Sequence, residues 1–163
     1  MSTTTLSEET IAPDFTLHDH DGISHTLSQY RGSWVLVYFY PKDATPGCTI
    51  EACALRDSWA DLQELGCVVL GISADTVESH KKFRDTHALP FTLLADTEKE
   101  VAKLYDVWKP KKIFGKEIVG IRRVSFLVNP SGVIARIYDP VMPAIHAYTV
   151  VQDLEKFVTH SKK

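Results

Sequence analysis

The segment WVLVYFY, residues 34–40, most constrains the fold of this chain because it is a continuous run of apolar and aromatic residues. Such a run, without polar alternation, is typical of a central strand that is buried on both faces of a sheet. Pro41 and the turn-forming residues DATPG end the strand. The sequence therefore predicts a sheet whose middle strand is covered on both sides.

The elements that follow predict the fold class. Between Thr49 and Leu65, apolar residues recur at three- and four-residue steps, which predicts one helix that Gly66 ends. Further strands are predicted over CVVLGIS, FTLLA, VSFLVN and VIARIYD, and further helices up to His87, over EKEVAKLYDV and over 146–160. This alternation, which ends in a hairpin, predicts an α/β domain with a thioredoxin-like arrangement, in which helices flank both faces of a mixed central sheet.

Length and composition limit the classes of protein. With 163 residues, we expect one domain over 1–163, with a flexible N-terminal segment over 1–11. The net charge of −3 argues against nucleic-acid and membrane-surface partners. No apolar run approaches the ~18 residues of a membrane span, and the N-terminus lacks the pattern of a secretory signal. We therefore expect a cytoplasmic protein.

Cys48 is one of only three cysteines and lies where thiol chemistry is favoured. It follows the C-terminal end of the buried strand and falls in the first turn of the predicted helix, which Pro46 can begin. The unpaired N–H groups and the helix dipole there favour a thiolate, which is the nucleophilic form. Gly47 leaves space for a small substrate against the backbone.

Polar residues near Cys48 suit a peroxide as substrate. The hydroxyl of Thr45 can donate to one substrate atom and accept from another. A cation must stabilise the negative charge on the oxygen that leaves, and Arg122 and Arg123 are the candidates. Tyr40 ends the strand beside this site, where its hydroxyl could reach the thiolate or the substrate.

Cys53 follows Cys48 by five residues. On an intact helix this spacing places the two Cα atoms roughly 8–9 Å apart and about 140° around the axis. A disulfide tolerates at most about 7 Å, so the two are either unrelated or a redox pair whose helix unwinds at its first turn. Cys67 opens an apolar strand, where packing is its expected role.

Several features have plainer interpretations. HDHDG, residues 18–22, contains possible metal ligands, but Asp-Gly indicates a turn. KPKKIFGK, residues 109–116, is basic, and we expect a solvated loop. A thioredoxin-type oxidoreductase is disfavoured because no C-x-x-C pair occurs, whereas a redox sensor that uses the same helix unwinding remains open.

Several motifs resemble the peroxiredoxin family. Pro41, Thr45 and Cys48 match its P-x-x-x-T-x-x-C motif. YFYPKDATPGCTIEACALRD and ISADTVESHKKFRDTHALPFTLLAD resemble the bacterioferritin comigratory protein, or PrxQ, subgroup. GIRRVSFLVNPSG resembles the segment with the family's arginine and places that residue at Arg123. The resemblance runs from about Ala12 to the C-terminal helix.

The resemblance implies a thioredoxin fold and an antioxidant thiol peroxidase that reduces hydrogen peroxide and organic hydroperoxides. Cys48 would be the peroxidatic cysteine, which becomes a sulfenic acid, and Cys53 the resolving cysteine, which forms an intramolecular disulfide with it. Thioredoxin or a similar disulfide reductant would restore both thiols. The resemblance implies no metal, haem or flavin, and a monomer or a dimer.

Overall fold

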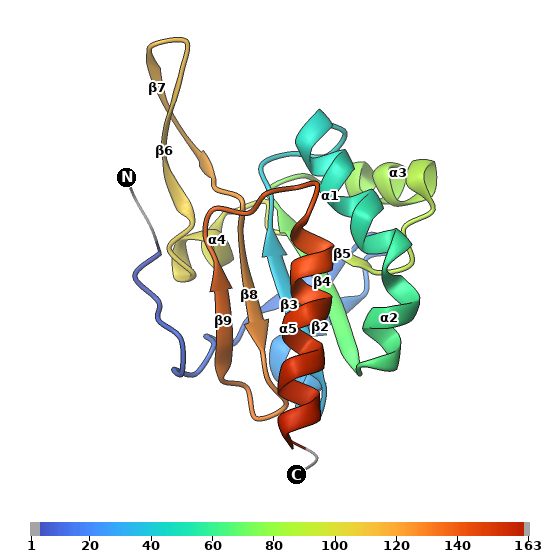
Figure 1. Ribbon diagram of the computed structural model, residues 1–163. Helices are drawn as coiled ribbons and strands as arrows, with labels where there is room; N and C mark the ends of the chain where they lie inside the picture. The colour runs from blue at the N-terminus through green and yellow to red at the C-terminus, as the bar shows by residue number, and fades with distance from the viewer. Residues whose placement is uncertain (1–3, 162–163) are drawn as a thin grey trace.

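The computed structural model describes residues 4–161 and contains a seven-stranded mixed sheet, a separate two-stranded hairpin and flanking helices (Figure 1). The elements are, in chain order, β1 (Thr16–Asp19), β2 (Ser24–Thr26), the 3-10 helix η1 (Leu27–Tyr30), β3 (Trp34–Phe39), α1 (Pro46–Asp57), α2 (Trp59–Glu64), β4 (Cys67–Ser73), α3 (Val77–His87), β5 (Thr92–Ala95), α4 (Glu100–Leu104), β6 (Trp108–Ile113), β7 (Lys116–Ile121), β8 (Val124–Val128), β9 (Ile134–Tyr138) and α5 (His146–Ser161).

The strand over WVLVYF lies inside the sheet, as predicted. The strand order is β2-β1-β5-β4-β3-β8-β9, so β3 has a neighbour on each side. It pairs in parallel with β4, from Trp34 opposite Cys67 to Phe39 opposite Ile72, and antiparallel with β8. Because β3, β4 and β5 are parallel, their carboxyl ends meet at one edge of the sheet, where α1 begins.

Alternate side chains of β3 enter two hydrophobic cores, one on each face of the sheet. Leu36, Tyr38 and Tyr40 pack with residues of α1, α2, α3 and α5. Val37 and Phe39 face the other way and pack with residues of α4 and η1. The prediction of helices on both faces is confirmed. Within residues 4–161, the helices are too short or too polar to span a lipid bilayer.

The single helix predicted between Thr49 and Leu65 is wrong, because α1 ends at Asp57 and α2 begins at Trp59. Ser58 separates them with φ −96° and ψ 6°, and the ψ angle lies outside the range of an α-helix. The second helix packs against β4 (Figure 1). Ser58 makes no side-chain capping bond, but a serine followed by the acidic Asp61 in the first turn is a weak helix-start signal inside an otherwise continuous apolar stripe.

The basic segment 109–116 is not a loop, because it belongs to the hairpin of β6 and β7, which projects from the sheet (Figure 1). Ile113 lies opposite Lys116, so Phe114 and Gly115 form a two-residue turn. Both have positive φ, 52° and 77°, as a type I′ hairpin turn requires. A phenylalanine is unusual in this conformation, and the sequence therefore gives no strong hairpin signal here.

The flexible N-terminal segment expected over 1–11 falls partly outside the described residues, since 1–3 are not described. From Thr4 on, the chain follows the domain: the Thr4 hydroxyl donates to the carbonyl of Tyr105 at 2.6 Å. Ile11 forms an isolated antiparallel bridge with Val133. The mobility of the segment stays a prediction.

Candidate active site

Cys48 lies in the first turn of α1, just past the carboxyl end of β3. A loop that starts at the half-buried Pro41 leads from the strand to Thr45, the N-cap residue of α1. The Thr45 hydroxyl donates to the carbonyl of Lys42 at 2.8 Å and makes no capping bond to the helix. The N–H groups of the first turn therefore lack a side-chain cap, and Cys48, which lies in this turn, is only 1% exposed.

Arg123 brings a positive charge to this sulfur from the segment between β7 and β8. Its Nη1 donates to Cys48 Sγ at 3.4 Å. Gly47 makes room for it, because a Cβ there would lie 2.8 Å from Arg123 Nη2. Arg122, the other candidate, pairs instead with Asp139, with 3.7 Å between Nη2 and Oδ1. The structure thus places Arg123, Gly47 and Cys48 in mutual contact.

Glu51 joins this group and was not anticipated from the sequence. Its Oε1 accepts a hydrogen bond from Arg123 Nη1 at 2.9 Å, so one guanidinium nitrogen serves both the carboxyl and the thiol. Burial raises the pKa of Glu51 to about 7, although the hydrogen bond and charge of Arg123 act to lower it. This carboxyl therefore titrates near neutrality, and it shares Arg123 Nη1 with Cys48.

His146, the first residue of α5, faces Glu51 from the other side. Its Nε2 lies 4.0 Å from Glu51 Oε2. Neither atom has a hydrogen-bond partner, and both side chains are buried. Burial, together with the charge of Arg123, lowers the pKa of His146 to about 4. Because Glu51 and His146 are far apart in the sequence, no local pattern could have paired them.

The Tyr40 hydroxyl, which was expected to reach the thiolate or the substrate, faces Asp43 instead. The Tyr40 hydroxyl is committed to a neighbouring carboxylate, since it donates to Asp43 Oδ1 at 2.6 Å. Tyr38, two residues earlier, stacks on Tyr40 with ring centroids 5.4 Å apart. The Tyr38 hydroxyl is buried without a hydrogen-bond partner, and burial raises its pKa well above the ordinary value, with Glu51 and Cys48 adding to the shift.

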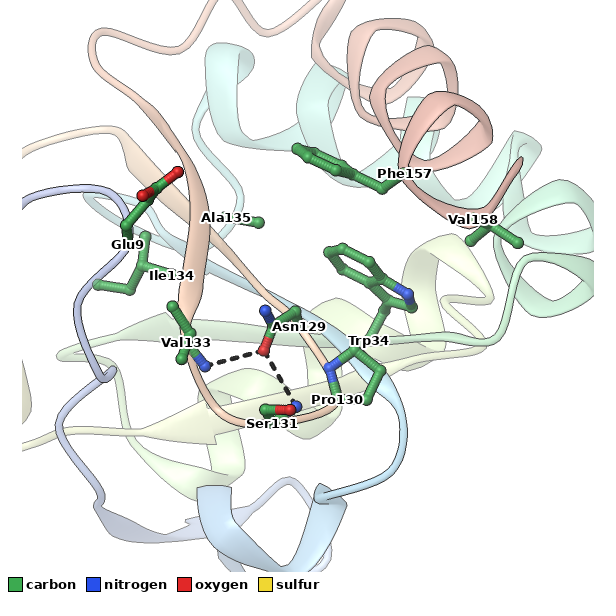
Figure 2. A pocket seen from close by; sticks show the side chains of 10 residues that line it. All are labelled: Glu9, Trp34, Asn129, Pro130, Ser131, Val133, Ile134, Ala135, Phe157 and Val158. Carbon is green, nitrogen blue, oxygen red and sulfur yellow. Dashed lines mark hydrogen bonds between the residues drawn. The ribbon is translucent and has the colours of Figure 1, made fainter. Parts of the chain in front are cut away.

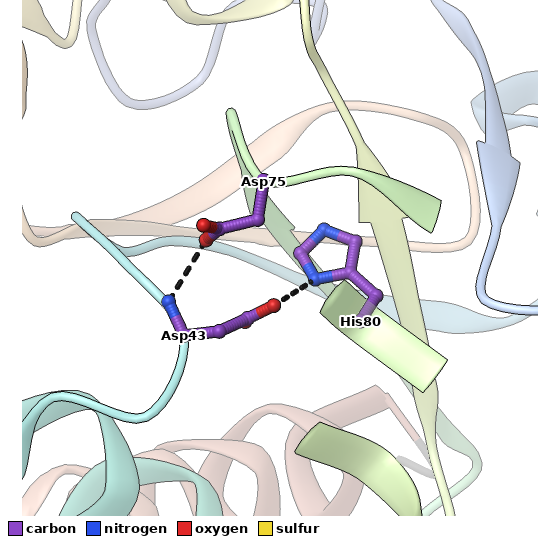
Figure 3. A group of neighbouring side chains, drawn as sticks. All are labelled: Asp43, Asp75 and His80. Atoms are coloured by element: carbon purple, nitrogen blue, oxygen red, sulfur yellow. Dashed lines mark hydrogen bonds and ion pairs between the residues drawn. The ribbon is translucent and has the colours of Figure 1, made fainter. Parts of the chain in front are cut away.

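Asp43 anchors the loop before α1 through a cluster with Asp75 and His80 (Figure 3). His80 Nδ1 lies 2.7 Å from Asp43 Oδ2, and His80 Nε2 lies 2.9 Å from the carbonyl of Leu94. Asp75 Oδ2 accepts from the backbone N–H of Asp43 at 2.8 Å. The loop conformation that these bonds hold includes Ala44 at φ 62°, a strained angle for a residue with a side chain.

The same three side chains have the chemistry of metal ligands, because their donor atoms lie within 4.8 Å of one another. Both nitrogens of His80, however, already face protein oxygen atoms. The cluster therefore serves to position the loop.

Cys53 projects from α1 toward α3 and away from Cys48. It is half-buried, and its Sγ lies 3.8 Å from Nδ1 of His87. Cys48, Cys53 and Cys67 are all free thiols in this structure. The intact helix keeps Cys48 in the core and Cys53 at its margin.

Cys67 lies at the opposite edge of the sheet from Cys48. It opens β4 opposite Trp34, whereas Cys48 follows the other end of β3. A strand of this length separates the two edges by roughly 16 Å. Burial raises the pKa of Cys67 to about 12, so this thiol stays protonated at neutral pH.

A pocket of about 780 Å³ also lies at the Cys67 edge of the sheet (Figure 2). Trp34 and Phe157 stack across it, with ring centroids 5.3 Å apart. On its other side, Asn129 Oδ1 accepts from the backbone N–H groups of Ser131 and Val133 and thereby shapes the turn between β8 and β9. This pocket is distant from Cys48, and its lining contains no cysteine.

Comparison with known proteins gives consistent results. The pattern described as the AhpC/TSA family matches residues 9–137. Peroxiredoxin Bcp of Bacillus subtilis is 45% identical over 144 residues, which cover 88% of this chain and 92% of that protein. Peroxiredoxin Bcp of Escherichia coli is 42% identical over 146 residues, which cover 90% of this chain and 94% of that protein.

A solved structure of the Xanthomonas campestris bacterioferritin comigratory protein has the same fold, with a TM-score of 0.84 and 33% sequence identity. The alignment covers 88% of this chain and 92% of the other. That structure was described in connection with the alkyl peroxide reduction activity of the Xanthomonas protein.

Proposed function

The chain belongs to the AhpC/TSA family and is a thiol peroxidase of the Bcp/PrxQ peroxiredoxins, and from this premise we propose that Cys48 is its peroxidatic cysteine. The observation that supports this role most directly is the 3.4 Å contact between Cys48 Sγ and Arg123 Nη1 at the start of α1. A guanidinium and an uncapped helix N-terminus both favour the thiolate.

In the first step, the Cys48 thiolate attacks one peroxide oxygen and the oxygen–oxygen bond breaks. Cys48 becomes a sulfenic acid, and the other oxygen leaves and takes up a proton to give water or an alcohol. Arg123 stabilises the negative charge on the leaving oxygen. Thr45 turns its hydroxyl from the Lys42 carbonyl toward the bound peroxide, and Gly47 gives the substrate access to the backbone N–H groups.

The substrates are hydrogen peroxide and organic hydroperoxides. The alkyl peroxide reduction activity described for the similar Xanthomonas protein supports the organic class. The reaction needs no cofactor, because the sulfur of Cys48 itself accepts the oxygen atom from the peroxide.

In the second step, Cys53 attacks the sulfenic acid and forms a disulfide with Cys48. The intact α1 places the two sulfurs on different faces, so the first turn of this helix unwinds before they meet. Cys53 suits this role better than Cys67, which lies at the opposite edge of the sheet.

Thioredoxin or a similar reductant then reduces the disulfide by thiol–disulfide exchange. We expect a monomer or a dimer, which light scattering after size exclusion would distinguish. The cytoplasmic location expected from the sequence stays a prediction, and cell fractionation would test it.

Stopped-flow kinetics of peroxide reduction tests the proposal. Cys48→Ser is expected to consume no peroxide, and Cys53→Ser is expected to complete the first oxidation but not to cycle with thioredoxin. Mass mapping of the wild type after one equivalent of peroxide should find a Cys48–Cys53 linkage. Normal cycling by Cys53→Ser would show that the resolving role is assigned to the wrong residue.

A further inference from the structure

The sulfur of Cys53 has a histidine beside it, at the end of α3. The distance from Cys53 Sγ to His87 Nδ1 is 3.8 Å, which is within hydrogen-bond range for sulfur. The His87 ring also packs edge-on against Phe83, with centroids 5.1 Å apart, and this contact orients the ring. A base is thus positioned at the thiol to which we assign the second step.

A neighbouring hydrogen bond holds this pair together. Arg56 Nη1 donates to the backbone carbonyl of His87 at 2.8 Å. Arg56 lies one turn after Cys53 in α1, so the bond attaches the second half of α1 to the end of α3. Unwinding of the first turn around Cys48 therefore leaves Cys53 and His87 in contact.

Cys53 needs such help more than Cys48 does. Cys48 has Arg123 and the helix N-terminus beside its sulfur, whereas Cys53 lies in the middle of α1, away from the N–H groups of the first turn. Only a thiolate attacks efficiently, and an imidazole accepts protons in the neutral pH range.

We propose that His87 is a further catalytic residue, the general base for Cys53, and this role rests on the proposed resolving function of Cys53. His87, with its proton on Nε2, takes the thiol proton of Cys53 on Nδ1. The Cys53 sulfur then attacks the Cys48 sulfur, the sulfur–sulfur bond forms and the sulfur–oxygen bond breaks. The departing hydroxide takes up a proton and leaves as water; Cys53 is oxidised and the sulfenic sulfur is reduced.

The proton on His87 has a route to solvent. The ring lines an open pocket of about 340 Å³ between α3 and the loop before α1. The charged groups that face this pocket or adjoin the ring carry both signs: Lys42, Asp43, Asp75 and Lys82 from the lining, and Arg56 from α1. All of these remain in place in the variants below, so a change in pH dependence reports on His87.

The test is a single-turnover measurement of disulfide formation. Wild type, His87→Gln and the control His18→Gln are each oxidised with one equivalent of hydrogen peroxide, quenched at set times and analysed for the Cys48–Cys53 linkage by mass spectrometry. His18 is an exposed histidine on β1, remote from α1. Trapping of the sulfenic acid in the same samples reports the first step separately.

We expect His87→Gln to form the disulfide about 10²-fold more slowly near neutral pH, at the lower end of the usual contribution of a general base, and His18→Gln to match the wild type. The deficit should shrink as the pH rises, because hydroxide can then take the thiol proton in place of His87. His87→Asn provides the same comparison if the glutamine variant does not fold.

Two results would overturn the role of His87 while leaving the resolving cysteine intact: an unchanged rate in His87→Gln, or a deficit of equal size at every pH, which is the behaviour of a purely structural contact. Failure of the wild type to form the Cys48–Cys53 disulfide is a different result, because it removes the resolving function itself and with it the need for a base.

Discussion

Two buried pairs of a histidine and a carboxylate adjoin the active-site segment, and they differ in how completely hydrogen bonds satisfy them. In the pair of Asp43 and His80, both carboxylate oxygens and both ring nitrogens have partners. In the pair of Glu51 and His146, Glu51 Oε2 and His146 Nε2 face each other at 4.0 Å without a hydrogen bond.

Because of this difference, we interpret the pair of Asp43 and His80 as a scaffold and the pair of Glu51 and His146 as a site that titrates. Both nitrogens of His80 lie within hydrogen-bond distance of protein oxygens, so this ring is held at both ends. Glu51 and His146 instead have pKa values moved by burial toward their neutral forms. The first pair holds the loop before α1. In the second pair, the charge of the Glu51 carboxyl, which Arg123 contacts, changes with pH.

The largest expected effect is on stability, from Asp43→Ala. Removing the carboxylate leaves His80 Nδ1 and the hydroxyls of Tyr40 and Ser79 without their shared partner, at about 1–3 kcal/mol for each group. We therefore expect a loss of about 3–5 kcal/mol in the free energy of unfolding. Urea denaturation measures it, with Asp85→Ala, an exposed position of α3, as the control. A loss no larger than that of the control would contradict the scaffold role.

Arg123→Met should have the next largest effect, this time on activity. The substitution removes the cation shared by Cys48 and Glu51, and we expect a loss of about 2–4 kcal/mol of transition-state stabilisation, roughly 30- to 900-fold in kcat/KM for peroxide. The matched control is Arg122→Met, an adjacent half-buried arginine that pairs with Asp139. Equal losses in the two variants would argue against a specific role for Arg123.

The pH dependence of stability should reveal the second pair when one member is removed. The pKa of Glu51 is raised from 4.5 to about 7, so the folded state retains a proton that the unfolded state releases, and its contribution to stability falls as the pH rises through this range. The pKa of His146 is lowered from 6.5 to about 4, so its contribution rises with pH between these values. In the wild type the two slopes oppose each other.

In His146→Asn only the Glu51 slope remains, so this variant should lose up to about 3 kcal/mol of stability as the pH rises from about 4.5 to 7. In Glu51→Gln only the His146 slope remains, so this variant should gain up to about 3 kcal/mol as the pH rises from about 4 to 6.5. Urea denaturation at a series of pH values measures both slopes. Profiles that run parallel to the wild type in both variants would show that neither group titrates abnormally.

Ser79→Ala should have the smallest effect and sharpens the account of the first pair. The Ser79 hydroxyl donates to Asp43 Oδ2 at 2.9 Å, alongside His80. Its removal leaves the contact between Asp43 and His80 intact and should cost about 1 kcal/mol in urea denaturation, relative to Ser131→Ala on an exposed turn. A cost as large as that of Asp43→Ala would mean that the hydroxyl, and not the contact between Asp43 and His80, holds the loop.

Features that depend on neighbouring residues were predictable from the sequence. The continuous apolar run before Pro41 indicated the central strand, and Pro46 indicated the start of α1 around Cys48. The turn at Gly22 was also predictable, because Asp-Gly is a local turn signal, and the structure gives this glycine a positive φ of 78°.

Features that depend on tertiary packing were not predictable in this way. Glu51 meets His146, and Cys53 meets His87, only because α5 and α3 dock beside α1, and neither pairing leaves a spacing in the sequence. The turn at Phe114 was missed because local preference disfavours a positive φ for phenylalanine, whereas strand pairing imposes it.

The interruption at Ser58 sets a limit on how far a disturbance can spread along the chain. Unwinding spreads readily along a continuous helix, because helix formation is cooperative and each residue that unwinds also breaks a hydrogen bond of its neighbours. A separate α2, docked on β4, forms a boundary to the cooperative unit that would open during resolution. Under the proposed mechanism, the first turn of α1 can then rearrange in every catalytic cycle while α2 and β4 stay folded.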